Sequence, residues 1–257
     1  MSVDSLIVVL LLCVFGLLLY VLHKLQIMQN QLGDAHRQME NLVHDQTQGL
    51  FVQLEAYLSL RDKLNLDQGL PYTPYWSASP DFLKIIAEHC LEHKPQHIVE
   101  CSSGLTSLVL ARCCESNQQG QVFSLENGED YARKTRQELE RYSLQNYATV
   151  FHAPLLTQMI NGEDYLWYSL AELPEQSIDM LVIDGPPGYI QSLSRYPALP
   201  LLFDKLADQC MVFMDDAARD DEKKIVERWL SEFPGIEHQY IKTERGCSML
   251  RISKTDR

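Results

Sequence analysis

The stretch that decides the fold is Ile98-Val-Glu-Cys-Ser-Ser-Gly-Leu-Thr-Ser107, in which apolar residues suited to a buried strand run into a turn of small residues. Two further stretches follow the same plan: Val122-Phe-Ser-Leu-Glu126 and Ile178-Asp-Met-Leu-Val-Ile-Asp-Gly-Pro-Pro-Gly188. In an open α/β sheet, ligands bind at the loops that follow the carboxyl ends of the strands. The three stretches therefore predict strands whose polar ends build one ligand site.

The number of residues between the turn of the first stretch and the acid of the second is also informative. Glu126 ends its strand 22 residues after Gly104. Small residues in a turn let a ligand approach the backbone, and an acid at this spacing accepts hydrogen bonds from ribose hydroxyls. The pair indicates a nucleoside site. Taken alone, Glu126 could equally be a solvated acid at the start of a helix, where the helix dipole favours it.

The composition is that of a globular protein with an acidic surface. The chain has 257 residues, of which 46% are hydrophobic, which is enough for one large domain and an appendage. The net charge is −13, and residues 69–257 hold 28 acidic and 18 basic residues. A phosphate backbone binds clustered Lys and Arg. The charge therefore argues against a nucleic-acid partner.

The cysteines indicate a reducing compartment. Their number is odd and no pair has the spacing C-x-x-C, so buried free thiols fit better than a disulfide framework. The seven positions are Cys13, Cys90, Cys101, Cys113, Cys114, Cys210 and Cys247.

The N-terminus predicts a membrane anchor after a short tail, residues 1–4. Residues 5–22 carry no formal charge, and as a helix they would be about 27 Å long, near the minimum for crossing a bilayer. A cleaved signal peptide is the alternative, but no basic residue precedes this segment and no small-x-small site follows it. Lys24 and Arg37 follow it, which predicts a single-pass protein with a cytoplasmic C-terminal domain, in the inner membrane if the source is prokaryotic.

Residues 23–68 predict a helical stalk. Apolar residues keep 3,4 spacing for about three heptads, the lower limit for a coiled coil. Gln46 and Gly49 interrupt the pattern before it resumes at Leu50. A homodimer through this stalk and a helix lying on the C-terminal domain are both compatible with the pattern.

Residues 69–257 predict an α/β domain with a doubly wound, mostly parallel sheet and a C-terminal antiparallel hairpin, because strands alternate with helices before two strands follow each other directly. The expected strands are 97–100, 121–125, 148–152, 178–183 and 211–214, and the hairpin pairs 239–243 with 248–252. The expected helices begin at Ser79-Pro80 and span 106–114, 129–142 and 220–233.

Glu100-Cys-Ser-Ser-Gly-Leu-Thr-Ser107 resembles motif I of class I S-adenosylmethionine-dependent methyltransferases, which often reads Glu-x-Gly-x-Gly-x-Ser/Thr, with Ser102 in place of the first glycine. The resemblance covers roughly residues 71–252 and implies a Rossmann-like fold. It also implies S-adenosylmethionine as cofactor, with Glu126 on the ribose and Ala153 on the adenine side. The remaining cofactor residues that it implies are Glu100, Ser102, Ser103, Gly104, Thr106 and Asp184.

Three acids follow two expected strands and form the sharper hypothesis. Asp184, Asp215 and Asp216 would meet at neighbouring strand ends, where three carboxylates repel one another unless a cation or proton balances them. Mg²⁺ or another divalent cation prefers such oxygen ligands and would lower the pKa of an acceptor hydroxyl. Metal-dependent small-molecule O-methyltransferases of the family keep acids at the same strand ends. The alternative is that all three acids cap the turns and helix that follow them.

The methyl acceptor has no recognised general base. Pro187 stands where the catechol-type members of the family keep a lysine. The acceptor would then be activated by the metal alone, by Asp216 or by a residue that the sequence does not reveal. Asp184 and Asp216 are the candidate catalytic residues. The segment 189–200, with Tyr189, Arg195 and Tyr196, is either a lid over the acceptor or a structural crossover.

The leading interpretation is a membrane-tethered methyltransferase, which acts on an oxygen of a small or lipid-linked, saccharide-type acceptor. A non-catalytic, membrane-anchored interaction or cofactor-binding protein is the alternative. An NAD-dependent oxidoreductase fits less well, because the turn lacks the third glycine of G-x-G-x-x-G and no Tyr-x-x-x-Lys pair lies in place.

Overall fold

The computed structural model describes residues 3–67, 69–71 and 78–254. The chain divides into two compact units, residues 1–51 and 52–257. Met1 and Ser2 of the predicted tail lie outside the described residues.

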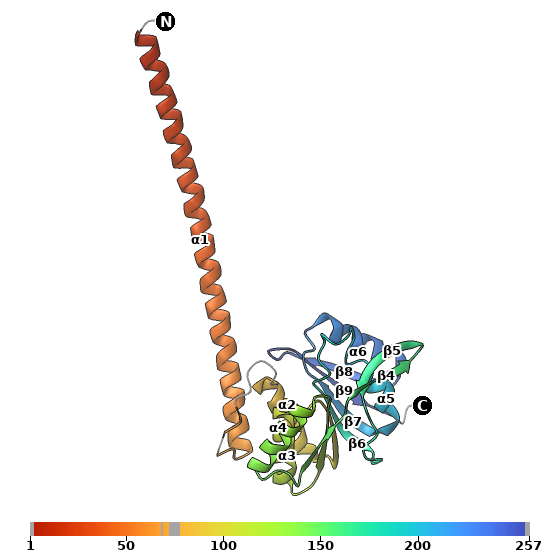
Figure 1. Ribbon diagram of the computed structural model, residues 1–257. Coiled ribbons are helices and arrows are strands. Elements are labelled where there is room, and N and C mark those ends of the chain that lie inside the picture. Colours follow the sequence, from red (N-terminus) through yellow and green to blue (C-terminus); the bar gives the residue numbers. More distant parts are fainter. Residues whose placement is uncertain (1–2, 68, 72–77, 255–257) are drawn as a thin grey trace. The chain divides into compact units, whose positions relative to one another are not determined.

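The described residues of the first unit, 3–51, are all helical. They belong to α1 (Val3–Lys63), the long red-to-orange helix of Figure 1, so the predicted anchor and stalk share one continuous helix. An 18-residue window of α1 has a mean hydropathy of 3.0, and by length and composition alone this helix could cross a membrane. The apolar residues of the predicted stalk, among them Leu25, Leu32 and Met39, stay exposed in the single chain. Dimerisation through them stays a prediction.

The end of α1 belongs to the second unit. Ala56 and Leu60 are buried, and Leu60, Leu64 and Leu66 join the core that also contains Phe82. The compact unit thus begins at residue 52, inside the segment that the sequence assigns to the stalk.

The second unit is a seven-stranded sheet in the order β3-β2-β1-β6-β7-β9-β8, with helices on both faces. The strands β1, β2, β3, β6 and β7 are parallel, and β8 and β9 run antiparallel at one edge. The predicted α/β fold is therefore observed. The bounds of the strands are β1 (His97–Cys101), β2 (Gln121–Glu126), β3 (Ala148–His152), β6 (Ile178–Ile183), β7 (Leu206–Met214), β8 (Ile236–Ile241) and β9 (Cys247–Ile252).

Alternation along the central strands explains the two layers of helices. Met180 and Val182 of β6 face one core, whereas Leu181 and Ile183 face the other. One core packs α2 (Pro80–His93), α3 (Leu105–Asn117) and α4 (Glu129–Arg141). The other packs α5 (Ala198–Leu202), the 3₁₀ helix η1 (Phe203–Lys205) and α6 (Asp220–Glu232), so the sheet is doubly wound (Figure 1).

One hairpin was not predicted. β4 (Leu155–Ile160) and β5 (Glu163–Tyr168) pair antiparallel as a separate sheet on the second core. They are joined by Asn161 and Gly162, both with positive φ, as a two-residue hairpin turn requires. The hairpin buries Trp167 and Tyr168, and Tyr168 reaches the site described below.

The cysteines agree with the sequence interpretation. All seven are free thiols, and every one except Cys13 is buried.

Candidate active site

Four parallel strands end at one edge of the sheet and deliver the polar residues that the sequence singles out. Glu126 is the last residue of β2, Asp184 follows β6, and Asp215 follows β7. From β1 the chain builds outward through β2 and β3, whereas β6 and β7 lie on its other side. Such a reversal of strand order opens a crevice at the carboxyl ends of the central strands.

The loop after β1 carries unusual backbone angles. Ser102 has φ +130°, a region that residues with a side chain seldom adopt, and Gly104 has φ +140°. The Ser102 N–H donates to the carbonyl of Leu125, which fastens the loop to β2. Backbone strain of this kind concentrates at ligand sites and costs on the order of 1–3 kcal/mol. A Cβ at Gly104 would meet no atom within 4 Å, so the loop is open on that side.

Glu100 lies beneath this loop and holds its shape. Its side chain is buried, and it accepts hydrogen bonds from the hydroxyls of Thr106, Ser107 (2.6 Å) and Ser124 (2.6 Å). The Ser107 hydroxyl also accepts the N–H of Gly104. Burial raises the pKa of Glu100 to about 7, although the three hydroxyls favour its charged form. Glu100 and Thr106 therefore support the loop from within.

Glu126 lies at the mouth of the crevice. It accepts hydrogen bonds from the Ser103 hydroxyl (3.0 Å) and from the Gly128 N–H (2.9 Å). Burial raises its pKa, and these two donors oppose the rise. A carboxylate tied down by two donors still has free lone pairs, so it can accept further hydrogen bonds from a ligand.

A cavity opens between the loop after β1 and the ends of β2 and β6; we call it the first cavity. Of the predicted cofactor residues, Ser102, Ser103, Glu126 and Asp184 line it. Glu100, Gly104, Thr106 and Ala153 do not line it. The Ala153 N–H donates to the carbonyl of Glu126, which ties β3 to β2. The other lining residues are Asn127, Gly128, Tyr131, Tyr168, Gly185, Pro187 and Tyr189.

The sequence did not predict Asn127, Gly128, Tyr131 or Tyr168 as lining residues, and Tyr168 comes from the hairpin that was not predicted. A Cβ at Gly185 would lie 2.4 Å from the Tyr168 hydroxyl, so glycine alone lets β5 pack against the turn after β6. The signal for this arrangement was Asn161-Gly162, a dipeptide that favours tight hairpins between apolar strands. The tyrosine reaches the cavity only because that hairpin folds back onto the sheet.

The three predicted acids converge. Each of Asp184, Asp215 and Asp216 offers a carboxylate oxygen, and these oxygens all lie within 4.8 Å of one another. Burial, together with the other acids, raises the pKa of Asp184 to about 7 and that of Asp215 to about 8. Both Asp215 side-chain oxygens are buried and have no hydrogen-bond partner among the described residues.

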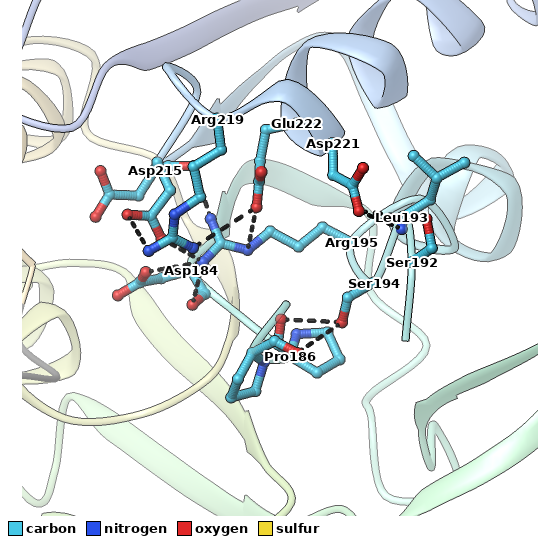
Figure 2. Close-up of polar contacts among 12 residues, drawn as sticks. Asp184, Pro186, Ser192, Leu193, Ser194, Arg195, Asp215, Arg219, Asp221 and Glu222 are labelled. Atoms are coloured by element: carbon cyan, nitrogen blue, oxygen red, sulfur yellow. Dashed lines mark hydrogen bonds and ion pairs between the residues drawn. The ribbon is translucent and has the colours of Figure 1, made fainter. Parts of the chain in front are cut away.

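A buried arginine lies among these acids, as Figure 2 shows. The side chain of Arg195 is only 2% exposed. Its Nη2 lies 2.7 Å from Asp216 Oδ2, 3.0 Å from the carbonyl oxygen of Asp184 and 3.5 Å from Asp184 Oδ1. Its Nη1 donates to the carbonyl of Asp215 at 2.6 Å. Arg219 adds a second ion pair to Asp216, at 2.9 Å.

The arginine changes the metal hypothesis. Three carboxylates are a suitable donor set for Mg²⁺. However, the guanidinium of Arg195 already contacts two of them, Asp184 and Asp216, and it supplies the positive charge that the cluster requires. The acids come together as predicted, but their surroundings do not fit a divalent cation as well as they fit this arginine.

A second, larger cavity of about 580 Å³ lies beside the acids. Its size falls within the range of small-molecule sites. Polar and charged side chains dominate its wall, among them Arg219, Glu222 and Arg245. Asp184, Pro187 and Tyr189 line both cavities, so Asp184 is the acid at their junction.

The segment 189–200 divides into an exposed and a buried part. Tyr189 is 77% exposed at the junction of the cavities. Ser194, Arg195, Tyr196 and Leu199 are buried. The second part is therefore a structural crossover, and only the residues near Tyr189 remain available as a cover for a ligand.

Comparison with known proteins identifies the domain. Residues 99–217 match the family model described as "Methyltransferase domain". The chain carries a methyltransferase domain. The predicted enzyme class is thereby confirmed. A comparison with curated proteins gives no match.

Solved structures agree on the fold of this methyltransferase domain. An O-methyltransferase from Bacillus cereus in complex with S-adenosylhomocysteine (SAH) has a TM-score of 0.54 and 14% identity, over 77% of this chain and 91% of its own. The SAH-bound methyltransferase PaMTH1 from Podospora anserina has a TM-score of 0.56 and 13% identity, over 77% and 88%. TomG from Streptomyces achromogenes, an O-methyltransferase involved in tomaymycin synthesis and solved with S-adenosylmethionine, has a TM-score of 0.53 and 12% identity, over 78% and 89%.

The buried Glu100 makes a prediction about pH. Its pKa is about 7 in the folded chain against an ordinary value of 4.5, so the folded state binds a proton more tightly than the unfolded state. Its contribution to stability is therefore full below about pH 4.5 and falls until about pH 7, by about 3 kcal/mol at most. We expect Glu100→Gln to flatten the loss of stability between pH 5 and pH 8, as measured by urea unfolding of the full chain in detergent.

The matched control is Glu237→Gln, because Glu237 is exposed on β8. This variant should show the same dependence of the free energy of unfolding on pH as wild type. An unchanged slope in Glu100→Gln would contradict the assignment of the raised pKa to this carboxyl.

Proposed function

We propose that the methyltransferase domain transfers the methyl group of S-adenosylmethionine to a hydroxyl oxygen of an acceptor held in the second cavity. The observation that carries this proposal is the meeting of the two cavities at Asp184. A cofactor in the first cavity and an acceptor in the second would bring their reacting atoms together at that carboxylate. Such placement is the main requirement of a displacement reaction.

The first cavity suits the nucleoside part of the cofactor. Glu126 would accept hydrogen bonds from the ribose hydroxyls, since it lines this cavity. The strained loop around Ser102 and Ser103 would lie along the methionine part. Glu100 holds that loop from below and does not itself reach the cavity.

Asp184 is the best candidate for the general base. When bound, S-adenosylmethionine would supply the methyl group, with an O–C bond made and the sulfonium C–S bond broken to leave S-adenosylhomocysteine. Asp184 would take the hydroxyl proton of the acceptor. A pKa of about 7 matches this task, because a base works best when its pKa lies near the working pH. Asp216, the other predicted catalytic residue, already has both carboxylate oxygens in ion pairs with Arg195 and Arg219, which leaves Asp184 as the better candidate.

The acceptor belongs to a polar class. The second cavity presents both acids and arginines, which suits a ligand with several hydroxyls or charged groups. Residues 5–22 would tether the domain to a membrane, with the domain on the cytoplasmic side. Tethering raises the effective concentration of the domain near membrane-bound acceptors. A small or lipid-linked, saccharide-type acceptor fits both features.

The cofactor assignment predicts the behaviour of Glu126→Ala. Loss of a charged acceptor for the ribose should weaken the affinity for SAH by about tenfold or more. Calorimetry on the full chain in detergent measures this affinity. Glu129→Ala is the control, because Glu129 is exposed in the first turn of α4 and should not alter binding. Wild-type protein that binds NAD⁺ instead, or neither compound, would favour one of the two alternative functions.

The base assignment predicts the behaviour of Asp184→Asn. Turnover should fall by roughly 100-fold or more, the usual range for a lost general base. Wild-type activity should rise with pH as Asp184 loses its proton near pH 7 and should level off above that, and the variant should lack this rise. Mass spectrometry of membrane extracts measures the product, which is heavier than the acceptor by one CH₂ unit. A variant as active as wild type would remove Asp184 from the mechanism.

The tether predicts a distinct fractionation. The full chain should stay with membranes after alkaline carbonate treatment and enter solution only with detergent. Leu11→Lys with Leu18→Lys should release it, because each lysine costs about 3 kcal/mol at the centre of a membrane helix. Leu32→Lys with Met39→Lys is the control, with the same spacing in the stalk, and should leave it bound. Release of the wild-type chain by carbonate alone would contradict the tether.

A further inference from the structure

A single nitrogen atom contacts acids from the ends of both β6 and β7. Arg195 Nη2 contacts Asp216 Oδ2, the Asp184 carbonyl and Asp184 Oδ1, so it joins oxygens from both strand ends. A metal ion bound by Asp184 and Asp216 would have to contact those same carboxylates. Nη2 therefore already contacts one oxygen of each of the two carboxylates that such an ion would need.

The arginine is fixed from both sides of its own segment. The Ser194 hydroxyl donates to the carbonyls of Pro186 and Pro187, and the Leu193 N–H donates to Asp221. The Trp229 Nε1–H donates to the carbonyl of Tyr196. Figure 2 shows the segment held on the side of Ser194 and Leu193. With its segment fixed, the guanidinium cannot leave the acids without breaking its own buried hydrogen bonds to Asp215 and Asp216.

Charge reinforces the geometry. Arg195 lies near Glu222 as well as Asp184 and Asp216, and Arg219 approaches Asp216 from the exposed side. Two guanidinium groups at one carboxylate repel a third positive charge. The feature that still favours a metal is Asp215, whose side-chain oxygens have no hydrogen-bond partner among the described residues.

We infer that the guanidinium of Arg195 takes the place of a divalent cation in this acid cluster, so that the domain holds its site together without a metal ion. The part of this inference that concerns catalysis rests on the proposed function. Arg195 touches the backbone carbonyls of Asp184 and Asp215 as well as the carboxylates. It is a positioning residue, which sets Asp184 at the junction of the two cavities.

The test is a titration of the full chain in detergent with Mn²⁺, followed by the electron paramagnetic resonance of the free ion. Wild-type protein should bind no Mn²⁺ at the cluster, and EDTA should leave its methyl transfer unchanged. Arg195→Met removes the charge and should gain one bound Mn²⁺ per chain. Adding Asp215→Asn to that variant should abolish the gained binding. Arg195→Lys keeps a positive charge among the acids and should exclude Mn²⁺ as wild type does.

Two outcomes of these titrations would contradict the inference about Arg195. Wild-type protein that binds one Mn²⁺, with the binding lost in Asp215→Asn, would overturn the inference. So would a folded Arg195→Met variant that binds none, because something other than the guanidinium would then exclude the ion. If Arg195→Met fails to fold by circular dichroism, the wild-type and Arg195→Lys titrations still decide. Failure of the proposed function would appear separately, as a wild-type chain that does not bind SAH.

Discussion

The site depends on one buried carboxylate. Glu100 has lost its contact with water, and it is satisfied only because hydroxyls from two other elements point at it: Thr106 and Ser107 from α3, and Ser124 from β2. A buried acid without such donors would cost far more than these bonds return. The requirement fixes how β1, β2 and the start of α3 meet. The shape of the loop at Ser102 follows from it, and so does the wall of the first cavity.

In the other half of the site, largely buried charged groups are again stabilised by partners from distant parts of the chain, here three acids and one arginine. Asp184, Asp215 and Asp216 come together because parallel strands end at the same edge of the sheet, and the cluster then requires a positive charge. Arg195 provides it from a crossover segment whose apolar neighbours, Tyr196 and Leu199, are buried in the second core. A buried glutamate hydrogen-bonded beneath a loop and a buried arginine paired with acids from two strand ends thus define the two ends of the crevice.

Regular elements were predictable where the local pattern was unambiguous. The bounds of β3 and β6 follow directly from their apolar runs, and Ser79-Pro80 marks the start of α2. β7 begins at Leu206, earlier than expected. Its pairing with β6 shifts register and Gln209 has a positive φ, so the first half of the strand lacks the regular apolar pattern that marks the second half. The hairpin of β4 and β5 was missed although Asn161-Gly162 signalled it.

The site was predictable only in part, for a physical reason. Strand order places Glu126 and Asp184 at the same edge, and sequence spacing alone anticipates that. Nothing local reveals that Arg195 turns inward, because its partners lie 11 to 21 positions away along the chain. Contacts of that range depend on the tertiary fold. In the same way, Ala153 and Gly104 keep their expected positions in the chain but contribute backbone geometry and no lining of the cavity.

The wall that both cavities share has a consequence for the order of events. Asp184, Pro187 and Tyr189 belong to both compartments, and Tyr189 is the exposed member of the three. A molecule bound in one cavity contacts residues that also line the other cavity, so it changes the surface that the second molecule binds. Sequential entry, with the first occupant completing the pocket for the second, is the kinetic scheme that such a shared wall favours over independent entry.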